Sequence, residues 1–317
     1  LTSFVMSSLL CRIFSSEESF ILSYTVRKIP LIMKFHTPFF VIAQMDQKKV
    51  TLKRILIKWL ERVASQRADF FSSPSRQMAE IISKEYGIDI AKIKVMPLPI
   101  DTDLFKPAQK NIQDKRIVLY TGRLEVRKGV DILADAIPLV LEKIPDVKFI
   151  FIGKDNFSAH YGMTLKDLIL KKAGRPEQIK FYDHMDRKKL IEHYRQSSVC
   201  VIPSVWENFG YTVLEAMACG TPVITTDTVG ITEYLDQSGV IKVPAENSEA
   251  LAEAIIKILE DHELRQKSKT KVRYMAENSF SRKMVSFQYE RYYQYIMEKI
   301  SLKAKKGSVS CLKVARS

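Results

Sequence analysis

Short apolar segments alternate with amphipathic segments of helical length along most of this chain, and this alternation constrains the fold more than any other feature. After residue 115 the apolar segments lie at residues 117–120, 147–152, 179–182, 199–202 and 223–226. The segments with helical periodicity lie at residues 131–144, 164–173, 188–196, 211–219 and 249–261. A strand–helix–strand order produces parallel sheets with helices on their faces. We therefore predict an α/β fold with a nearly complete doubly wound domain here.

The chain before residue 107 repeats the pattern on a smaller scale. Apolar segments at residues 31–35, 68–72 and 92–96 predict three strands, and residues 52–67 predict a helix. The apolar residues of this helix share one face: Leu52, Ile55, Leu56, Trp59, Leu60 and Val63. A second helix should end at Tyr86.

The ends of that second helix have recognisable residues. Ser73 and Pro74 suit its N-cap and first helical position, and Gly87 suits its stop. Residues 97–115 are polar and contain proline, which predicts a linker between two domains.

We predict two facing Rossmann-like domains of unequal size. Residues 1–107 form the N-terminal domain and residues 108–283 the C-terminal domain. A full Rossmann-like domain has about six strands. The N-terminal domain should therefore be incomplete, with on the order of 60 to 90 residues absent from its front.

Two segments close the chain. Residues 284–300 predict an aromatic-rich helix that must pack against other parts of the protein, and residues 301–317 form a basic tail without acids. We predict that this tail is solvated and irregular.

Composition narrows the function classes. The net charge of +14 indicates a polyanionic partner such as nucleic acid, anionic lipid or a phosphorylated substrate. The chain has no helix-turn-helix, zinc-finger or RNP-like motif, which argues against nucleic acid. It also has no apolar run of about 20 residues and no signal-peptide pattern. Four widely spaced cysteines fit reduced thiols, so we predict a cytoplasmic location, or the cytoplasmic face of the membrane.

One candidate site follows the segment at 117–120, in the sequence Thr-Gly-Arg-Leu-Glu-Val-Arg-Lys-Gly. Ligands of parallel sheets bind at the carboxyl ends of strands. Gly122 allows a ligand to approach the backbone closely, and Arg123 and Lys128 offer cations suited to a diphosphate. A basic surface loop is an equally good interpretation of this segment alone.

A second candidate site begins just after the segment at 199–202, at residues 203–224. Gly210 precedes a predicted helix, whose first-turn N–H groups attract anions. Glu207 lies in the loop and Glu215 inside the helix, and carboxylates accept hydrogen bonds well from vicinal diols. Two such acids could hold the hydroxyls of a ribose and of a sugar.

This second segment resembles the motif of family 4 retaining glycosyltransferases, which have the two-domain GT-B fold. The resemblance extends from His36 to the C-terminal helix and is strongest over residues 119–243. It implies transfer of a sugar from a nucleotide-diphosphate sugar, with retention at the anomeric carbon. It also implies that no cofactor and no metal ion is needed.

The resemblance also implies roles for individual residues. Arg123 and Lys128 would bind the donor diphosphate, Glu207 the donor sugar and Glu215 the ribose. The remaining residues expected at the donor are Gly122, Phe209, Gly210, Gly153, His184 and His36. Of these, Phe209 and Gly210 would offer backbone N–H groups, Gly153 would leave room near the donor, His184 would lie near the base, and His36 would contact the sugar from the other domain.

The sequence departs from the family in one respect that affects function. The glycine-rich loop expected near the N-terminus, which approaches donor and acceptor, is not visible. The acceptor is expected to be a hydroxyl on a lipid-linked molecule, a polysaccharide or another compound, as in cell-envelope or polysaccharide synthesis, with peripheral contact to an anionic membrane. The alternative is a non-catalytic module that binds nucleotide sugar without transferring it.

Overall fold

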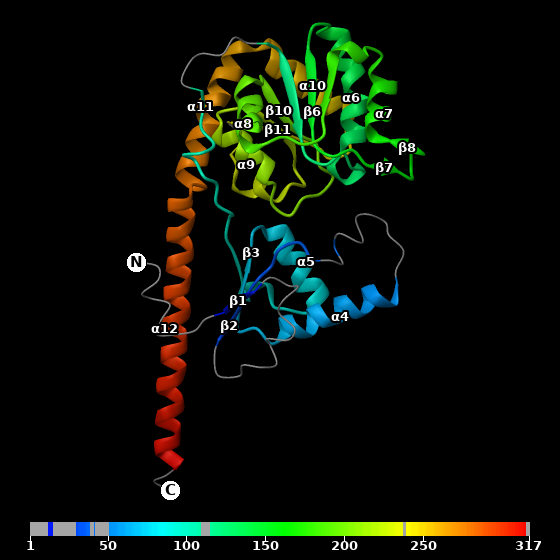
Figure 1. Cartoon of the computed structure of the whole chain (residues 1–317). Coiled ribbons are helices and arrows are strands. Elements are labelled where there is room, and N and C mark those ends of the chain that lie inside the picture. The colour runs from blue at the N-terminus through cyan, green and yellow to red at the C-terminus, as the bar shows by residue number, and fades with distance from the viewer. Residues whose placement is uncertain are drawn as a thin grey trace.

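The computed structural model describes residues 12–14, 30–38, 41, 51–108, 115–236 and 239–314. Figure 1 shows two α/β bodies, one above the other, and a long C-terminal helix that leaves the upper body and runs beside the lower one. The described strands form one sheet in the lower body and one main sheet in the upper body, and both sheets are parallel.

The lower body contains a four-stranded sheet in the order β1-β2-β3-β4. Its elements are β1 (Arg12–Phe14), β2 (Leu31–Lys34), α4 (Leu52–Gln66), β3 (Phe70–Ser73), α5 (Arg76–Tyr86), η1 (Ile90–Lys92) and β4 (Ile93–Val95). The last three strands match the three predicted ones. The first strand was not predicted, because its three residues, Arg-Ile-Phe, do not stand out from the apolar patches that precede them in the sequence. The incompleteness of this domain stays a prediction.

The upper body contains a six-stranded sheet in the order β12-β11-β10-β5-β6-β9. Its strands are β5 (Ile117–Thr121), β6 (Lys148–Ile152), β9 (Ile179–Tyr182), β10 (Val199–Ile202), β11 (Val223–Thr226) and β12 (Val240–Val243). Its helices are η2 (Val126–Lys128), α6 (Val130–Lys143), α7 (Leu165–Ala173), η3 (Pro176–Gln178), α8 (Arg187–Gln196), α9 (Tyr211–Ala218), η4 (Gly230–Tyr234), α10 (Ser248–Glu260) and α11 (His262–Ser279). A short antiparallel hairpin, β7 (Phe157–Ser158) with β8 (Met163–Thr164), precedes α7.

All five strands predicted in this body are present. Four of them could be predicted because their side chains are buried almost throughout, so each is a short apolar run. The fifth, β9, lies at the end of the strand order, and its side chains are only partly buried. The strand β12 and the helix α11 were not predicted. The two middle residues of β12 are half-buried, and α11 is mostly polar, so neither has a strong apolar pattern.

Helix α5 begins later than predicted. Its N-cap is Ser75, whose hydroxyl accepts a hydrogen bond from the Met78 backbone N–H at 3.2 Å. Ser73 instead belongs to β3 and donates to the Ser75 carbonyl oxygen at 2.9 Å. The prediction that Ser73 is the cap was therefore wrong, because three serines in this segment could each serve. Gly87 does end the helix, in the left-handed conformation.

The C-terminal helix α12 (Arg282–Val314) joins the two bodies (Figure 1). Near its start, Ile100 donates its backbone N–H to the Phe280 carbonyl oxygen, and Arg282 donates to the Ile100 carbonyl oxygen. Further along, the Tyr292 hydroxyl donates to the Phe71 carbonyl oxygen of β3 at 2.9 Å. The helix continues past the expected end at residue 300 to Val314, so the prediction that the basic tail is irregular was wrong for residues 301–314. Residues 302–306 are good helix formers, and the segment contains no proline.

Candidate functional site

Four adjacent parallel strands end at one edge of the larger sheet: β10, β5, β6 and β9. The loops that follow them contain most of the predicted site residues. Since carboxyl ends of parallel strands share an edge, residues far apart in the sequence meet here.

The closest contact between predicted site residues joins Lys128 and Glu207. The Lys128 Nζ lies 2.7 Å from Glu207 Oε1, and the two side chains are only 17% and 20% exposed. The Ser204 hydroxyl donates to the other Glu207 oxygen at 3.3 Å. The two candidate sites predicted separately after β5 and β10 therefore meet, and we call Lys128, Glu207 and Ser204 the charged cluster.

A glycine makes this contact between the two loops geometrically feasible. Gly129 has a φ of +66°, and a Cβ added there would lie 1.8 Å from the Pro203 carbonyl oxygen. A side chain at this position would push the β5 loop off the end of β10. Gly129 thus holds Lys128 beside the loop that contains Glu207.

Arg123 lies in the same loop as Lys128, but its partner is Glu125 and not Glu207. Its guanidinium contacts the Glu125 carboxylate at 2.7 Å and its side chain is 60% exposed. Its backbone is fixed, because the Tyr120 hydroxyl donates to the Arg123 carbonyl oxygen at 2.8 Å. An exposed guanidinium on a fixed backbone can turn toward an anion at this edge.

Gly122 and Gly153 lie against each other at the ends of β5 and β6. Gly122 donates its N–H to the Ile152 carbonyl oxygen at 2.9 Å, and a Cβ on Gly153 would lie 2.0 Å from the Gly122 carbonyl oxygen. We expected Gly153 to leave room for a donor. In the structure the Gly122 carbonyl oxygen occupies the place of a side chain at residue 153, which is why glycine is required there. The predicted place of Gly153 beside the donor stays a prediction.

Helix α9 begins at the same sheet edge. Gly210 is its N-cap with a φ of +100°, and a Cβ there would lie 2.6 Å from Val229 Cγ1. Phe209 is buried in an aromatic cluster with Tyr234 and Phe280, which fixes the loop before the helix. In the first turn of α9 the Val213 N–H already donates to the Gly210 carbonyl oxygen at 3.1 Å, so the N–H groups of Tyr211 and Thr212 are the ones that can bind an anion.

Glu215 is connected to the end of β5 through a residue that sequence reasoning missed. The Tyr194 hydroxyl of α8 donates to Glu215 Oε2 at 2.9 Å and lies 2.8 Å from Thr121 Oγ1. Burial raises the pKa of Glu215, against the hydrogen bond from Tyr194 and the nearby charge of Arg187. Tyr194 had only the pattern of a core residue, which gave no functional signal.

His36 lies after β2, in the lower body. Although its side chain is exposed, loss of neighbouring water lowers its pKa, and the charge of Lys34 acts in the same direction. Its neighbour Phe35 belongs to the same buried cluster as Trp206, which precedes Glu207. His36 and Glu207 therefore flank one point of contact between the two bodies.

Further contacts between the bodies were not predicted from the sequence. The Glu233 carboxylate of η4 accepts from the Arg76 backbone N–H at 2.7 Å, and the Tyr234 hydroxyl donates to the Pro74 carbonyl oxygen at 3.0 Å. The Ser75 hydroxyl also lies 3.4 Å from Asn208 Oδ1. These contacts attach the start of α5 to the loops beside the charged cluster.

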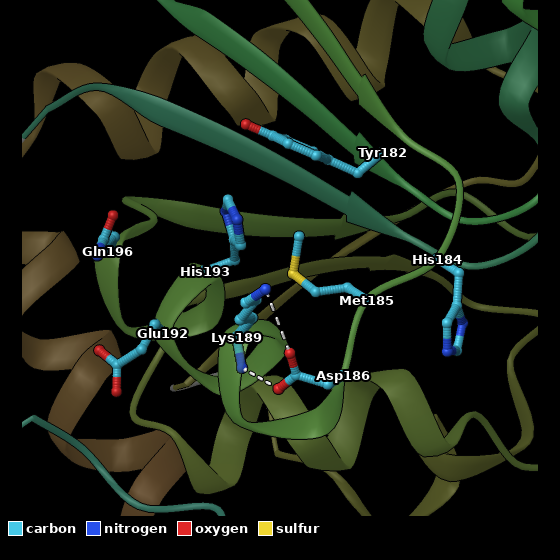
Figure 2. A pocket seen from close by; sticks show the side chains of 8 residues that line it. All are labelled: Tyr182, His184, Met185, Asp186, Lys189, Glu192, His193 and Gln196. Atoms are coloured by element: carbon cyan, nitrogen blue, oxygen red, sulfur yellow. Dashed lines mark hydrogen bonds and ion pairs between the residues drawn. The ribbon is translucent and has the colours of Figure 1, made fainter.

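His184 lies apart from the charged cluster, after β9. Figure 2 shows it at one end of a cavity of about 390 Å³, on the opposite side of Met185 from His193. The lining is Tyr182, His184, Met185, Asp186, Lys189, Glu192, His193 and Gln196. This cavity does not include Lys128 or Glu207. Tyr182 of its lining accepts a backbone hydrogen bond from the Gly153 N–H at 2.8 Å, which links the end of β9 to the end of β6.

Other chemistry is limited in the part of the chain that the structure describes. It holds no cluster of three or more His, Cys, Asp or Glu side chains suited to a metal. Cys200 and Cys219 are buried free thiols, and burial raises the pKa of Cys219 to about 12, which keeps it protonated. None of the described helices could cross a membrane.

Two family models match the chain. The model described as Glycosyl transferases group 1 matches residues 101–275, and the model described as Glycosyltransferase Family 4 matches residues 15–104. A D-inositol 3-phosphate glycosyltransferase of Mycobacteroides abscessus is 27% identical over 245 residues, covering 73% of this chain and 53% of that protein. An uncharacterized glycosyltransferase of Methanocaldococcus jannaschii is 28% identical, covering 59% of this chain and 50% of that protein. The chain thus spans about half the length of these curated relatives.

Solved structures share the fold. Sucrose-phosphate synthase from Thermosynechococcus elongatus superposes with a TM-score of 0.73 at 21% identity, covering 91% of this chain and 74% of that one. Anabaena Alr3699/HepE in complex with UDP superposes with a TM-score of 0.71 at 19% identity, covering 88% and 75%. These neighbours are GT-B glycosyltransferases, which confirms the predicted GT-B-like α/β architecture with parallel sheets.

Proposed function

Since this chain belongs to the glycosyl transferases group 1 family, we propose that it moves a sugar from a nucleotide-diphosphate sugar to a hydroxyl acceptor with retention at the anomeric carbon. The observation that supports this most directly is the Lys128–Glu207 pair at the shared edge of β5 and β10. It offers a cation for phosphate and a carboxylate for sugar hydroxyls within one cluster.

The leaving group determines what the cations do. As the bond from sugar to phosphate breaks, negative charge accumulates on the departing diphosphate and the sugar becomes oxocarbenium-like. Lys128, Arg123 and the first-turn N–H groups of α9 stabilise that charge more in the transition state than in the bound substrate, which lowers the barrier. No metal ion or other cofactor is needed in this scheme, because protein groups neutralise the diphosphate.

The acids and the histidine bind the donor. Glu207 accepts hydrogen bonds from the sugar hydroxyls, and Glu215 accepts from the ribose while Tyr194 holds its carboxylate. His36, with its lowered pKa, is neutral at pH 7 and contacts the sugar from the lower body. A donor phosphate oxygen takes the proton of the acceptor hydroxyl on the same face of the sugar.

The experiment that tests this function screens first donors and then acceptors. HepE was solved with UDP, and the Mycobacteroides relative is named for inositol 3-phosphate. UDP, GDP and ADP sugars are therefore screened by thermal shift, and the donor that stabilises the chain is incubated with D-inositol 3-phosphate, polysaccharide or lipid-linked acceptors. Release of nucleoside diphosphate only when an acceptor is present supports transfer.

The same experiment tests the alternative function. Stabilisation by a donor without release of nucleoside diphosphate for any acceptor would indicate a nucleotide-sugar-binding module. The four-stranded sheet of the described lower body, smaller than the six strands of the upper one, is the observation that favours this alternative. Absence of stabilisation by every donor would contradict both functions.

A further inference from the structure

Lys34 is a half-buried lysine at the end of β2 in the lower body. Its Nζ lies 4.6 Å from the centre of the Tyr289 ring of α12, the helix that runs beside this body (Figure 1). Such a cation–π contact is favourable, but it covers only one side of an ammonium group that has three hydrogen-bond donors. Loss of neighbouring water lowers the pKa of Lys34, and no carboxylate of the described residues opposes this.

Tyr289 also has hydrogen-bonding capacity that the described residues leave unused. Its half-buried side chain packs against the cluster that contains Tyr292. The Tyr289 hydroxyl forms no hydrogen bond with any described residue, whereas the Tyr292 hydroxyl further along the same helix donates to the Phe71 carbonyl oxygen at 2.9 Å. An ammonium and a hydroxyl that both lack a polar partner therefore lie side by side, and we call Lys34 and Tyr289 the β2–α12 pair.

The β2–α12 pair lies near the place where the two bodies meet. His36 follows Lys34 by two residues, and after loss of water the charge of Lys34 is the second cause that lowers the pKa of His36. Burial raises the pKa of Tyr289, and Tyr293 and then Tyr211 act in the same direction. Since Tyr211 is the first residue of α9 in the upper body, the pair lies near the start of that helix as well as near His36.

We propose that the β2–α12 pair binds an anionic group, such as a phosphate, on the acceptor. An ammonium and a phenol both donate hydrogen bonds to phosphate oxygens, and a bound anion would restore the stabilisation that the ammonium loses on burial. The acceptor is favoured over the donor as the source of the anion. Arg123 and Lys128 already offer cations to the donor diphosphate from the upper body, whereas the pair belongs to β2 and α12.

The identity of the bound molecule as the acceptor rests on the proposed function, whereas binding of an anion by the pair does not. Anion binding is measured without turnover. The two ideas can therefore fail separately: a chain that no nucleotide sugar stabilises contradicts the proposed function, and a pair that binds no anion contradicts this one.

Titration calorimetry of the whole chain with inorganic phosphate, D-inositol 3-phosphate and uncharged inositol tests the pair. UDP, GDP and ADP are all present in excess, so that the donor site is filled whichever base it takes. We expect the two phosphate-bearing probes to bind more tightly than inositol, and Lys34→Met to weaken their binding at least about tenfold. Tyr289→Phe keeps the ring beside the ammonium but removes the hydroxyl, and should weaken binding about threefold.

Lys166→Met is the matched control, because the Lys166 Nζ also lies over an aromatic ring, that of Phe181 in the upper body, at 5.4 Å. This variant should bind the probes as the wild-type chain does. Lys34→Arg, which keeps the cation, should retain most of the affinity. The melting temperature of Lys34→Met should not fall, because an apolar side chain of similar length replaces a partly desolvated cation.

In the transfer assay, Lys34→Met should raise the KM for a phosphorylated acceptor at least about tenfold and change the KM for the donor by less than about twofold. Equal anion affinity in Lys34→Met and the wild-type chain would overturn the proposal, as would absence of anion binding while the nucleotides are present. A rise in the KM for the donor instead of the acceptor would overturn it too, because Lys34 would then bind the donor diphosphate.

Discussion

Removing the charge of Lys128 tests the centre of the proposed site. In Lys128→Met the side chain keeps its length, but Glu207 loses the partner at 2.7 Å and keeps only the longer Ser204 contact at 3.3 Å. A fully buried carboxylate stripped of its partner costs about 3–5 kcal/mol. Because Glu207 is 20% exposed, water offsets part of this, and we expect a loss of about 1–2 kcal/mol. This corresponds to a fall of roughly 2–5 °C in melting temperature.

The effect on turnover should be larger than the effect on stability. If Lys128 stabilises charge that develops on the departing diphosphate, its removal should lower kcat about 10²–10³-fold while the KM for the donor changes much less. Release of nucleoside diphosphate is the assay, with donor concentration varied at saturating acceptor. Lys172→Met is the control, because Lys172 pairs with Asp135 on the outer helices, away from the strand ends.

A kcat within about threefold of the wild-type value would refute the role of Lys128. A fall in kcat that Lys172→Met reproduces would attribute the effect to stability instead. The variant Glu207→Gln separates the effect on stability from the effect on turnover. It removes the unpaired negative charge, but it also removes the carboxylate that accepts hydrogen bonds from the sugar hydroxyls. Combined with Lys128→Met, it should restore stability without restoring turnover.

Three further predictions concern the surroundings of the pair. Burial raises the pKa of Glu215, so its carboxylate becomes protonated at a higher pH than an ordinary glutamate, whose pKa is 4.5. As pH falls, donor affinity measured by titration calorimetry should therefore weaken before an ordinary glutamate would be protonated. Glu215→Gln should bind the donor weakly at every pH. Gly129→Ala should lower the free energy of unfolding in urea by at least about 2 kcal/mol, while Gly174→Ala, at a φ of +67° with no atom within 4 Å, should cost only about 1 kcal/mol. Glu233→Ala removes the acceptor of the Arg76 N–H at 2.7 Å and should lower the melting temperature by about 2–4 °C; an unchanged value would show that this contact does not hold the two bodies together.

Only part of the charged cluster could be predicted from the sequence. The sequence indicated two loops after two apolar segments, one with Lys128 and one with Glu207, and the general rule for parallel sheets puts both loops at one edge. The sequence could not show that the two side chains meet at 2.7 Å, or that Gly129 is required because Pro203 lies against it.

The amino-acid sequence by itself determined the order of buried strands and helices, because each element repeats its apolar residues at its own period. It also determined that the cations and acids of the site follow strand ends. Only the tertiary structure decided which neighbours those elements meet. Tyr194 looked like a core residue until Glu215 lay beside it, and the apolar face of α4 looked like a packing face until the fold turned it outward. Periodicity records which side of an element is apolar, whereas the partner of that side comes from residues far away in the chain.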